Sequence, residues 1–403
     1  MVQECEVCLH PLSGPKLDLG SHPLCDDLIK IGELHEVPRY HQELILCNYC
    51  LTAQQLHQVK KEKLFKADYH YRASLTKDVI VGMSQLVAKS LGEMKLKENP
   101  VILDIGCNDG TLLGLFKEKM NCLTIGIDPT NAIQEAGEKI DLALQGFFDK
   151  DLANLIYSKH GFPDVITFTN VFAHIEKFQE LLDALRILIG PETHLIIENH
   201  YLGSILETNQ VDTFYHEHPR TYSAKSFDVI ATSLGLNLNL VEFPSRYGGN
   251  IRVRMSKMEN VELKVELPDE SDFVAKFQKL QSIYDEWLIE SKATIEKLLL
   301  RGPLLGKSLP GRAVMLISAL GLTSAEIPFV LEQPHSPKVG FYVPGTDIQI
   351  VSDDQLEVLG QPNLILWAWH ISDEVIPYIL ELGYKGSIWV PLPTFAEKVK
   401  TQH

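Results

Sequence analysis

The stretch Val101-Ile-Leu-Asp-Ile-Gly-Cys-Asn-Asp-Gly-Thr-Leu112 decides the fold. Its opening, Val101-Ile-Leu-Asp104, predicts a buried strand, and a glycine-rich turn follows that strand directly. Glycine has no side chain, so such a turn after the first strand of an α/β sheet lets a ligand approach the backbone closely. We therefore expect a strand, a ligand-binding turn and a helix, in that order.

Downstream of this stretch, short apolar segments alternate with helix-like segments. Further buried strands are expected at 123–128, 164–169 and 194–198. The helix-like segments lie at 111–119, 131–140 and 176–189. Strands and helices in alternation predict a parallel, doubly wound sheet, so the expected fold class is α/β.

Two further parts flank this unit. Residues 1–65 are rich in Cys, His, Pro and Gly and contain no long amphipathic helix. A charged helix over about 269–300 precedes a second α/β unit, whose strands are expected at 312–317, 338–343, 362–367 and 386–390. We expect three domains: a small N-terminal domain (1–65), a ligand-binding domain (66–245) and a C-terminal Rossmann-like domain (246–403).

Two cysteine pairs with the same spacing stand in the N-terminal segment. They are Cys5-x-x-Cys8 and Cys47-x-x-Cys50. A two-residue spacer lets a tight turn aim both sulfurs at one metal, and two such pairs complete a closed tetrahedral zinc site. A closed site has no open position, so this zinc is expected to be structural. Two unrelated buried pairs or redox cysteines are the alternative.

Composition narrows the range of partners and compartments. The 403 residues carry 37 basic and 53 acidic side chains, a net charge of −16, which argues against nucleic acid or an anionic membrane as the main partner. The sequence contains neither a run of about 18 apolar residues nor a secretory signal, so no membrane span is expected. Seven cysteines, an odd number, fit a disulfide framework poorly. We expect a cytoplasmic protein with a small-molecule substrate, of open oligomeric state.

The polar residues around the glycine turn indicate the kind of ligand. The turn does not match the Gly-x-Gly-x-x-Gly fingerprint of dinucleotide binding. Its acidic and amide side chains suit a ligand with an amino-acid ammonium group better than a pyrophosphate, and an acid at the end of the second strand can accept both ribose hydroxyls. The candidate cofactor-binding residues are Asp104, Gly106, Asn108, Asp109, Gly110, Asp128 and Asn170.

This combination resembles the S-adenosylmethionine (SAM) site of class I methyltransferases. A nicotinamide-dependent α/β enzyme is the alternative for the same pattern. Both would place the ligand at the carboxyl ends of the strands.

Two polar segments near the ends of later strands can carry chemistry. They are Asn170-Val-Phe-Ala-His174 and Phe214-Tyr-His-Glu-His-Pro219. In an extended conformation Tyr215 and Glu217 would share one face, with His216 and His218 on the other. Histidine is the natural general base near neutral pH, and tyrosine can donate a proton or hydrogen-bond an enolate.

Less specific interpretations of these segments stay open. The second segment could be a solvated polar loop, or His216, Glu217 and His218 could bind a second metal. Upstream, Tyr69-His-Tyr-Arg-Ala-Ser74 stands where the first two expected domains join. Its aromatic hydroxyls could line a ligand cleft or pack only for stability.

Taken together, the motifs resemble the sugar C-methyltransferases of deoxysugar and antibiotic-sugar biosynthesis over nearly the whole chain. The motifs that carry the resemblance are the two cysteine pairs, Leu103-Asp-Ile-Gly-Cys-Asn-Asp-Gly110, Gly126-Ile-Asp-Pro129, Asn170-Val-Phe-Ala-His174, Tyr215-His-Glu-His218, Gly248-Gly-Asn-Ile-Arg252, Phe341-Tyr-Val-Pro-Gly-Thr-Asp347 and Leu366-Trp-Ala-Trp369. The resemblance implies a zinc-binding domain, a class I SAM-methyltransferase domain of Rossmann-like fold and a second Rossmann-like domain.

The resemblance also implies a reaction on a nucleotide-linked 4-ketosugar. A base removes the proton alpha to the ketone, and the enolate attacks the methyl group of SAM. Its implied catalytic residues are His218, Tyr215, Glu217, His174 and Tyr69. Whether His218 or Tyr215 takes the proton stays open.

One stretch departs from the family pattern. Members open the C-terminal domain with a strand and a Gly-Tyr-Gly-Ala-Pro-Ala-Lys-Gly type turn, whereas the equivalent stretch here is expected to be 314–324, with Gly321 alone and no lysine. Such a turn would offer backbone amides to a phosphate group. Its loss leaves room for a different carrier or a non-sugar ketone, and for a non-catalytic scaffold that binds SAM or a nucleotide. Methyl transfer to oxygen or nitrogen on the same fold is a further alternative.

Overall fold

The computed structural model describes residues 2–33, 36–66, 71–75, 77–257, 265–356 and 360–400. Contacts divide the chain into two compact units. Unit 1 comprises Met1–Gly14, Ile45–Ser204 and Glu217–Val274, and unit 2 comprises Pro15–Leu44, Ile205–His216 and Ala275–His403. These spatial units cut across the expected domains of 1–65, 66–245 and 246–403, whose boundaries stay a prediction.

Unit 1 is built on a seven-stranded sheet in the order β11-β12-β9-β8-β5-β6-β7. Its strands are β5 (Val101–Ile105), β6 (Leu123–Asp128), β7 (Leu142–Gln145), β8 (Val165–Thr169), β9 (His194–His200), β11 (Asn237–Glu242) and β12 (Asn250–Ser256). β5 pairs in parallel with β6 on one side and with β8 on the other, so the chain reverses its winding at β5. The strands expected at 101–104, 123–128, 164–169 and 194–198 and the α/β class are confirmed.

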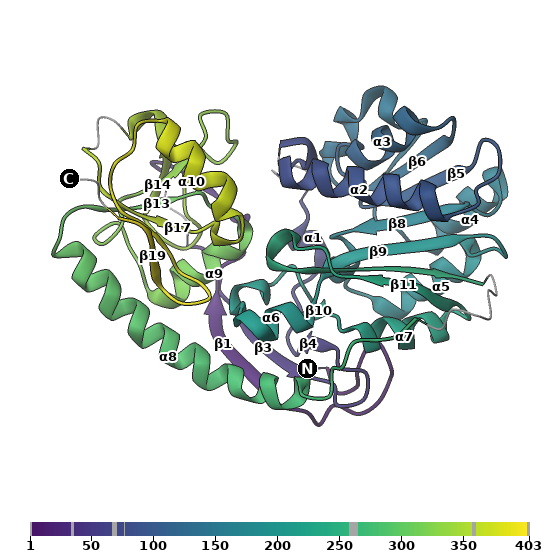
Figure 1. Cartoon of the computed structure of the whole chain (residues 1–403), viewed down its shortest axis with the longest axis horizontal. Helices are drawn as coiled ribbons and strands as arrows, with labels where there is room; N and C mark the ends of the chain where they lie inside the picture. Colours follow the sequence, from purple (N-terminus) through teal and green to yellow (C-terminus); the bar gives the residue numbers. More distant parts are fainter. Residues whose placement is uncertain are drawn as a thin grey trace. The chain divides into compact units, whose positions relative to one another are not determined.

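Helices cover both faces of this sheet, so its central strands are buried on both sides. All five residues of β5 are buried. The longer helices of unit 1 are α2 (Lys77–Glu93), α3 (Thr111–Lys119), α4 (Lys150–His160), α5 (Phe178–Leu188) and α7 (Ala224–Ser233). α2 packs on α3 and α4 packs on α5, and Figure 1 shows α2 and α3 above the strands and α7 below them. The helices expected at 111–119 and 176–189 are confirmed.

The helix expected at 131–140 is wrong. Two short 3-10 turns, η2 (Asn131–Glu135) and η3 (Gly137–Lys139), occupy this stretch. Gly137 has a φ of 55°, which a continuing right-handed helix does not allow. The turns lead directly into β7, which the sequence pattern had not indicated.

Short elements complete unit 1. They are β4 (Ala53–Gln55), β10 (Arg220–Thr221), α1 (Lys61–Leu64), η1 (Ala73–Leu75), η4 (Phe172–His174) and η6 (Arg246–Gly248). β4 pairs with β10 in antiparallel fashion, with Gln54 opposite Arg220. The cysteine-bearing segment is thereby joined to the chain that follows His218.

Unit 2 contains an eight-stranded sheet in the order β19-β18-β17-β13-β14-β16-β15-β2. Its strands are β2 (Ile29–Lys30), β13 (Leu304–Lys307), β14 (Phe329–Glu332), β15 (Phe341–Tyr342), β16 (Gln349–Ser352), β17 (Asn363–Leu366), β18 (Ile388–Val390) and β19 (Ala396–Val399). β1 (Lys16–His22) and β3 (Tyr40–Leu46) pair with each other in a separate sheet. The parallel core β16-β14-β13-β17-β18 has the Rossmann order 3-2-1-4-5.

The helices of unit 2 correct one expectation. The longer ones are α8 (Phe273–Leu299), which confirms the charged helix at 269–300, α9 (Gly311–Leu320) and α10 (Ser372–Glu381). The short ones are α6 (Leu202–Thr208), most of which lies in this unit, η5 (Val211–Thr213), η7 (Asp353–Gln355) and η8 (Trp369–Ile371). The strand expected at 312–317 is wrong, because that stretch lies inside α9. A short apolar run such as 313–317 is compatible with either a buried helix or a buried strand, and residues 312–317 are all buried.

This correction moves the expected departure from the family pattern to another stretch. The true strand is β13, and the turn that follows it lies between Lys307 and Gly311 rather than at 314–324. A lysine and a glycine therefore flank the turn. The strands expected at 362–367 and 386–390 are present as β17 and β18, whereas only Phe341–Tyr342 of 338–343 is a strand.

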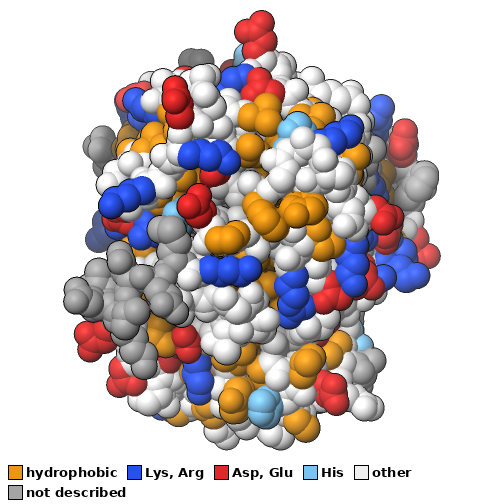
Figure 2. All heavy atoms as spheres, turned by 90° about the vertical axis from the view of Figure 1, so that its right-hand side faces the viewer, with side chains coloured by type: hydrophobic (Ala, Val, Ile, Leu, Met, Phe, Trp, Pro, Cys, Tyr) orange, Lys and Arg blue, Asp and Glu red, His pale blue; other side chains and the backbone are white. Residues whose placement is uncertain are grey.

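In the part of the chain that the structure describes, helices long and apolar enough to cross a bilayer are absent. On the face shown in Figure 2, hydrophobic side chains are scattered among lysine, arginine, aspartate and glutamate. Charges of both signs are interspersed there.

Candidate functional site

At two positions, the glycine turn of unit 1 takes a left-handed conformation that favours glycine. Gly106 and Gly110 have φ angles of 77° and 73°. A Cβ at Gly106 would lie 2.4 Å from Cγ2 of Val171, and one at Gly110 would lie 2.9 Å from Ile140. The turn therefore packs directly against the segment that follows β8, which brings the ends of β5 and β8 together.

A buried carboxylate lies under this turn. Asp104, at 2% exposure, accepts a hydrogen bond from the hydroxyl of Thr167 at 2.7 Å. Burial raises the pKa of Asp104 to about 7, the Thr167 hydrogen bond lowers it, and the neighbouring negative charge of Asp128 raises it further. A cationic group next to Asp104 would stabilise its ionised form.

Asp128 lies at the end of β6, as expected, and its hydrogen bonds hold the glycine turn in place. Its Oδ2 accepts from the backbone N–H of Asn108 at 2.9 Å, and its Oδ1 accepts from the hydroxyl of Thr130 at 2.6 Å. Oδ1 also accepts from the backbone N–H of Thr130 at 2.8 Å, whereas Oδ2 has a second lone pair. Asp128 can therefore hold the turn and still accept from a ligand hydroxyl.

Asn108 and Asp109 bind a strap of chain, residues 71–75, across the turn. Asn108 accepts from the N–H of Ala73 at 2.9 Å and donates to the carbonyl of Tyr71 at 3.1 Å. Asp109 accepts from the N–H of Ser74 at 3.0 Å. Burial raises the pKa of Asp109, but its hydrogen bonds with Ser74 and Thr111 outweigh this and leave that pKa below its ordinary value. These side chains thus hold the strap next to the turn.

Three histidine rings gather at the carboxyl edge of the sheet. The rings of His174 and His218 are 4.9 Å apart, and those of His218 and His200 are 5.0 Å apart. His174 follows β8 and His200 ends β9, so neighbouring parallel strands deliver both. His218 is the middle ring and is 4% exposed.

His174 is fixed in one tautomer. Its Nδ1 lies 2.8 Å from the carbonyl oxygen of Glu217, which can only accept, so Nδ1 carries the proton. Burial lowers the pKa of His174 to about 4, against the opposing effect of its hydrogen bonds. The ring is therefore neutral near pH 7, with its lone pair on Nε2.

The segment from Tyr215 to His218 is not extended. It forms a turn at His216 and Glu217, so the expected alternation of faces is wrong. Tyr215 and His216 belong to unit 2, whereas Glu217 and His218 belong to unit 1. Among the described residues, His216, Glu217 and His218 do not form a group with metal-ligand spacing.

In unit 2, Tyr215 lies beside Gly311, the first residue of α9. A Cβ on Gly311 would lie 3.7 Å from Cε2 of Tyr215. Three residues earlier, the buried Asp212 binds the guanidinium of Arg312 through both oxygens, at 2.7 and 2.6 Å, and accepts from the indole of Trp369 at 2.8 Å. This buried pair ties the chain before Tyr215 to the first turn of α9.

Sequence patterns did not single out His200, Tyr247 or the role of Tyr71. The ring of Tyr247 is 5.8 Å from that of His200, and its hydroxyl is 3.3 Å from that of Tyr71. His200 could have been found as the last residue of an apolar strand. Tyr69, an expected catalytic residue, lies outside the described residues.

Asn170 belongs to a buried polar network below these rings. Asn250 donates to Asn170 at 3.2 Å and to Glu198 at 3.0 Å. Glu198 is fully buried and also binds Arg246 at 3.0 Å and Arg252 at 2.7 Å. Asn170, expected to bind the cofactor, thus has its side chain within the network, next to Val171 and the glycine turn.

The four expected zinc ligands converge. One sulfur from each of Cys5, Cys8, Cys47 and Cys50 lies within 4.8 Å of all the others. The Cys5–Cys50 and Cys8–Cys47 sulfur distances are both 3.5 Å. A disulfide would need about 2.05 Å, whereas four sulfurs 2.3 Å from one zinc are about 3.8 Å apart. The donor set therefore fits zinc.

The cysteine knuckles contact the start of α7 and the backbone of His218. The hydroxyls of Ser223 and Ser226, at the start of α7, donate to the carbonyl of Cys50 at 3.1 Å each. Gln55, on β4, donates to the carbonyl of His218 at 3.0 Å. The metal-binding segment thus holds the backbone of His218.

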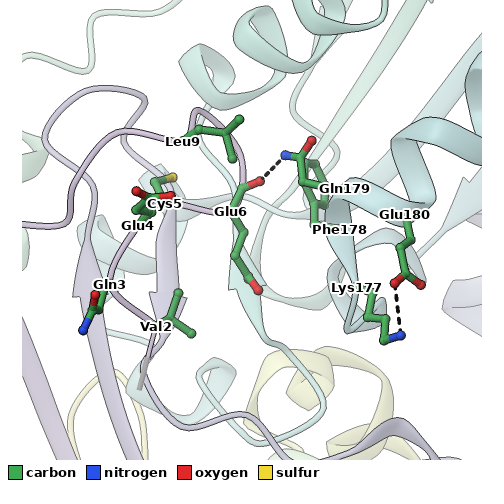
Figure 3. A pocket seen from close by; sticks show the side chains of 10 residues that line it. All are labelled: Val2, Gln3, Glu4, Cys5, Glu6, Leu9, Lys177, Phe178, Gln179 and Glu180. Atoms are coloured by element: carbon green, nitrogen blue, oxygen red, sulfur yellow. Dashed lines mark hydrogen bonds and ion pairs between the residues drawn. The ribbon is translucent and has the colours of Figure 1, made fainter.

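A surface hollow of about 550 Å³ borders the first knuckle. Residues 2–6, Leu9 and 177–180 line it, with Gln179 donating to the carbonyl of Glu6 at 2.6 Å (Figure 3). The expected catalytic and cofactor-binding residues do not line this hollow, so it is separate from the histidine rings.

Comparisons with known proteins agree with this arrangement. Residues 5–65 match a family described as a zinc binding domain, residues 75–241 match a methyltransferase domain, and residues 246–393 match a C-methyltransferase C-terminal domain. The C-methyltransferase NovU of Streptomyces niveus is 26% identical over 410 residues, which span 97% of this chain and 96% of NovU.

Two solved structures that resemble the chain each cover less than half of it. Magnesium protoporphyrin IX methyltransferase of Synechocystis PCC 6803 with bound SAH is 16% identical, covering 45% of this chain and 84% of its own, with a TM-score of 0.34. The PH0226 protein of Pyrococcus horikoshii OT3 is 14% identical, covering 49% and 99%, with a TM-score of 0.36.

Proposed function

We propose that the chain methylates a carbon next to the ketone of a nucleotide-linked deoxy-ketosugar, because it joins matches to a zinc binding domain, a methyltransferase domain and a C-methyltransferase C-terminal domain. The enzyme is a SAM-dependent C-methyltransferase, with zinc as its second cofactor. The observation that carries the proposal is the packing of His218 between His174 and His200, at the sheet edge that bears the glycine turn.

In the proposed reaction, His218 or Tyr215 removes the proton alpha to the ketone. Loss of that proton places negative charge on the ketone oxygen, and hydrogen-bond donors nearby would stabilise the enolate. SAM supplies a methyl group on a positively charged sulfur. The hydrogen bond from His174 to the carbonyl of Glu217 fixes the segment that carries His218, and Tyr69 is retained as a proposed catalytic residue.

We assign the ammonium group of SAM to the neighbourhood of Asp104. Three carboxylates, those of Asp104, Asp109 and Asp128, surround the glycine turn, and such a set favours a cation over a phosphate. Gly106 and Gly110 allow close approach, and Asp128 would accept from the ribose. Asn108 and Asp109 would support the cofactor site by holding the strap in place, and Asn170 would support it by holding the chain at the end of β8.

Replacing Asp104 by asparagine is expected to stabilise the free enzyme and weaken its binding of SAM. The folded state holds the Asp104 proton more tightly than the unfolded chain, so the free energy of unfolding falls as pH rises from about 4 to about 7 and then levels. Above pH 7, Asp104→Asn should therefore gain about 2–4 kcal/mol, and below pH 4 it should gain nothing. Urea unfolding at pH 8 and pH 4 measures this gain.

The same variant tests the cofactor assignment. A cation beside Asp104 favours its ionised form, so the affinity of the wild type for SAM should rise as pH increases through 7. Asp104→Asn should bind at least tenfold more weakly at pH 8 and show no such rise. Calorimetric titrations at pH 6 and 8 compare the two proteins, and equal affinities at pH 8 would contradict the assignment.

We propose that unit 2 binds the nucleotide at the end of β13. In Rossmann units a phosphate lies at the N-terminus of the first helix and an acid at the end of the second strand receives the ribose. Here α9 begins at Gly311, and Glu332 ends β14, where its carboxylate accepts from the N–H of Leu309 at 2.6 Å. Tyr215 lies beside Gly311, so a phosphate there would bring the sugar towards Tyr215.

The test of the proposed function is methyl transfer to a panel of nucleotide-linked ketosugars. We expect a product 14 mass units heavier, with the new methyl group on the carbon alpha to the ketone in its carbon NMR spectrum. A methyl on oxygen or nitrogen would replace the proposal by the alternative chemistry, and no product with any acceptor would favour a non-catalytic scaffold. We further propose cytoplasmic location and the domain boundaries 1–65, 66–245 and 246–403.

A further inference from the structure

Five aromatic side chains form a line along the carboxyl edge of the sheet in unit 1. They follow in the order Tyr71, Tyr247, His200, His218 and His174, with adjacent members 3.3 Å apart between hydroxyls and then 5.8, 5.0 and 4.9 Å apart between ring centres. One end of the line is joined to the glycine turn through the bond from Asn108 to the Tyr71 carbonyl. The line thus spans from the proposed cofactor turn to the proposed base.

Tyr247 takes its place in this line through a strained backbone. Its φ and ψ angles are 54° and 24°, in the left-handed region that tyrosine rarely adopts. Gly248 and Gly249 follow with φ angles of 86° and 117°, and a Cβ on Gly249 would lie 2.3 Å from the Ser204 hydroxyl. Strain of this kind persists where the surroundings over-determine it, and it collects at functional sites.

The surroundings of Tyr247 are a buried charge network. Arg246 is 6% exposed and pairs with the fully buried Glu198 at 3.0 Å. Its guanidinium occupies the space above Gly82, where a Cβ would lie 2.0 Å from Nη1. Across β9 and β12, Asn250 is opposite His200, which sets the turn bearing Tyr247 beside that histidine. The network therefore fixes the direction in which the phenol points.

The phenol of Tyr247 is suited to donate a hydrogen bond. Burial raises its pKa, against the lowering effect of Tyr71, so the hydroxyl stays protonated at neutral pH. In a pair of hydroxyls only one proton lies between the two oxygens, and the other proton is directed elsewhere. The Tyr71–Tyr247 pair thus presents one donor to its surroundings, next to the histidines.

We propose that Tyr247 is a further catalytic residue, whose hydroxyl, paired with that of Tyr71, hydrogen-bonds the ketone oxygen of the substrate as negative charge develops there. This inference rests on the proposed function. A donor at this oxygen stabilises the enolate more than the ketone, so it acts on kcat rather than on cofactor binding.

The experiment compares wild type, Tyr71→Phe, Tyr247→Phe and the double variant, with Tyr157→Phe on the exposed face of α4 as the matched control. We expect Tyr247→Phe to lower kcat by about 10–100-fold, with the Kd for SAM within twofold of wild type and Tm unchanged within about 2 °C. The double variant should fall little below Tyr247→Phe, because paired hydroxyls act as a unit. Tyr157→Phe should match the wild type.

Three outcomes would overturn the inference. Equal kcat in wild type and Tyr247→Phe would remove Tyr247 from the reaction while leaving the proposed function intact. A fall in kcat that is matched by a fall in Tm or in SAM affinity would show a structural role. Tyr71→Phe removes the other hydroxyl of the pair, so it tests the same interaction from the strap. Absence of a C-methylated product from the wild type would overturn the proposed function and this inference together.

Discussion

Replacement of His218 by alanine is expected to lower kcat for C-methylation by about 10²–10⁴-fold. His218 is the middle of three histidine rings and is buried, so its loss removes the imidazole nearest to both His174 and His200. The variant should still bind SAM, because the glycine turn and its carboxylates are untouched. Turnover under saturating substrate and calorimetric titration with SAM measure the two effects separately.

The control for this experiment is His160→Ala, in the last turn of α4, which should keep the wild-type kcat. Activity of His218→Ala within threefold of the wild type would exclude His218 as the base and leave Tyr215 as the candidate. Parallel loss of SAM affinity would instead show that His218 supports the cofactor turn.

Replacement of Cys50 by serine is expected to abolish zinc binding and to unfold the N-terminal segment. Zinc held by four thiolates contributes about 10–16 kcal/mol of apparent binding free energy in small domains, and serine is a poor ligand for this metal. We expect the zinc content to fall from one ion per chain to near zero, with a fall in Tm of more than about 10 °C. Atomic absorption and differential scanning calorimetry provide the two measurements.

Cys122→Ser is the matched control for Cys50→Ser. Cys122 is also buried, at 9% exposure, but lies in the core beside α3 and away from the four thiolates. It should retain one zinc and lose little stability. Full zinc content in Cys50→Ser would show that the four cysteines do not form one metal site.

Local patterns predicted the elements whose signal is contained in a few consecutive residues. The strand Val101–Ile105 and the glycine turn after it combine a short apolar run with Gly106 and Gly110. The cysteine pairs were equally local, since each knuckle needs only a two-residue spacer. These features could be predicted because neighbouring residues alone determine them.

Features that depend on distant partners were mispredicted or missed. Residues 313–317 form an apolar run that fits a strand equally well but lies inside α9, and the helix expected at 131–140 is interrupted at Gly137. Tyr247 acquires its place from the strand register that sets Asn250 opposite His200. The pair of Asp212 and Arg312 joins residues 100 positions apart, which no local window contains.

The hydrogen bonds of Gln55 have a consequence for how the enzyme can be inhibited. Gln55 donates from its side chain to the carbonyl of His218 and from its backbone to that of Pro219 at 2.9 Å, five residues after Cys50. Cys8 is the one partly exposed member of the four thiolates, so electrophiles and peroxides would attack it first. Loss of the metal would then loosen β4, whose Gln55 holds the backbone of His218. Oxidative stress would thus silence methylation from outside the catalytic pocket, without competing with either substrate.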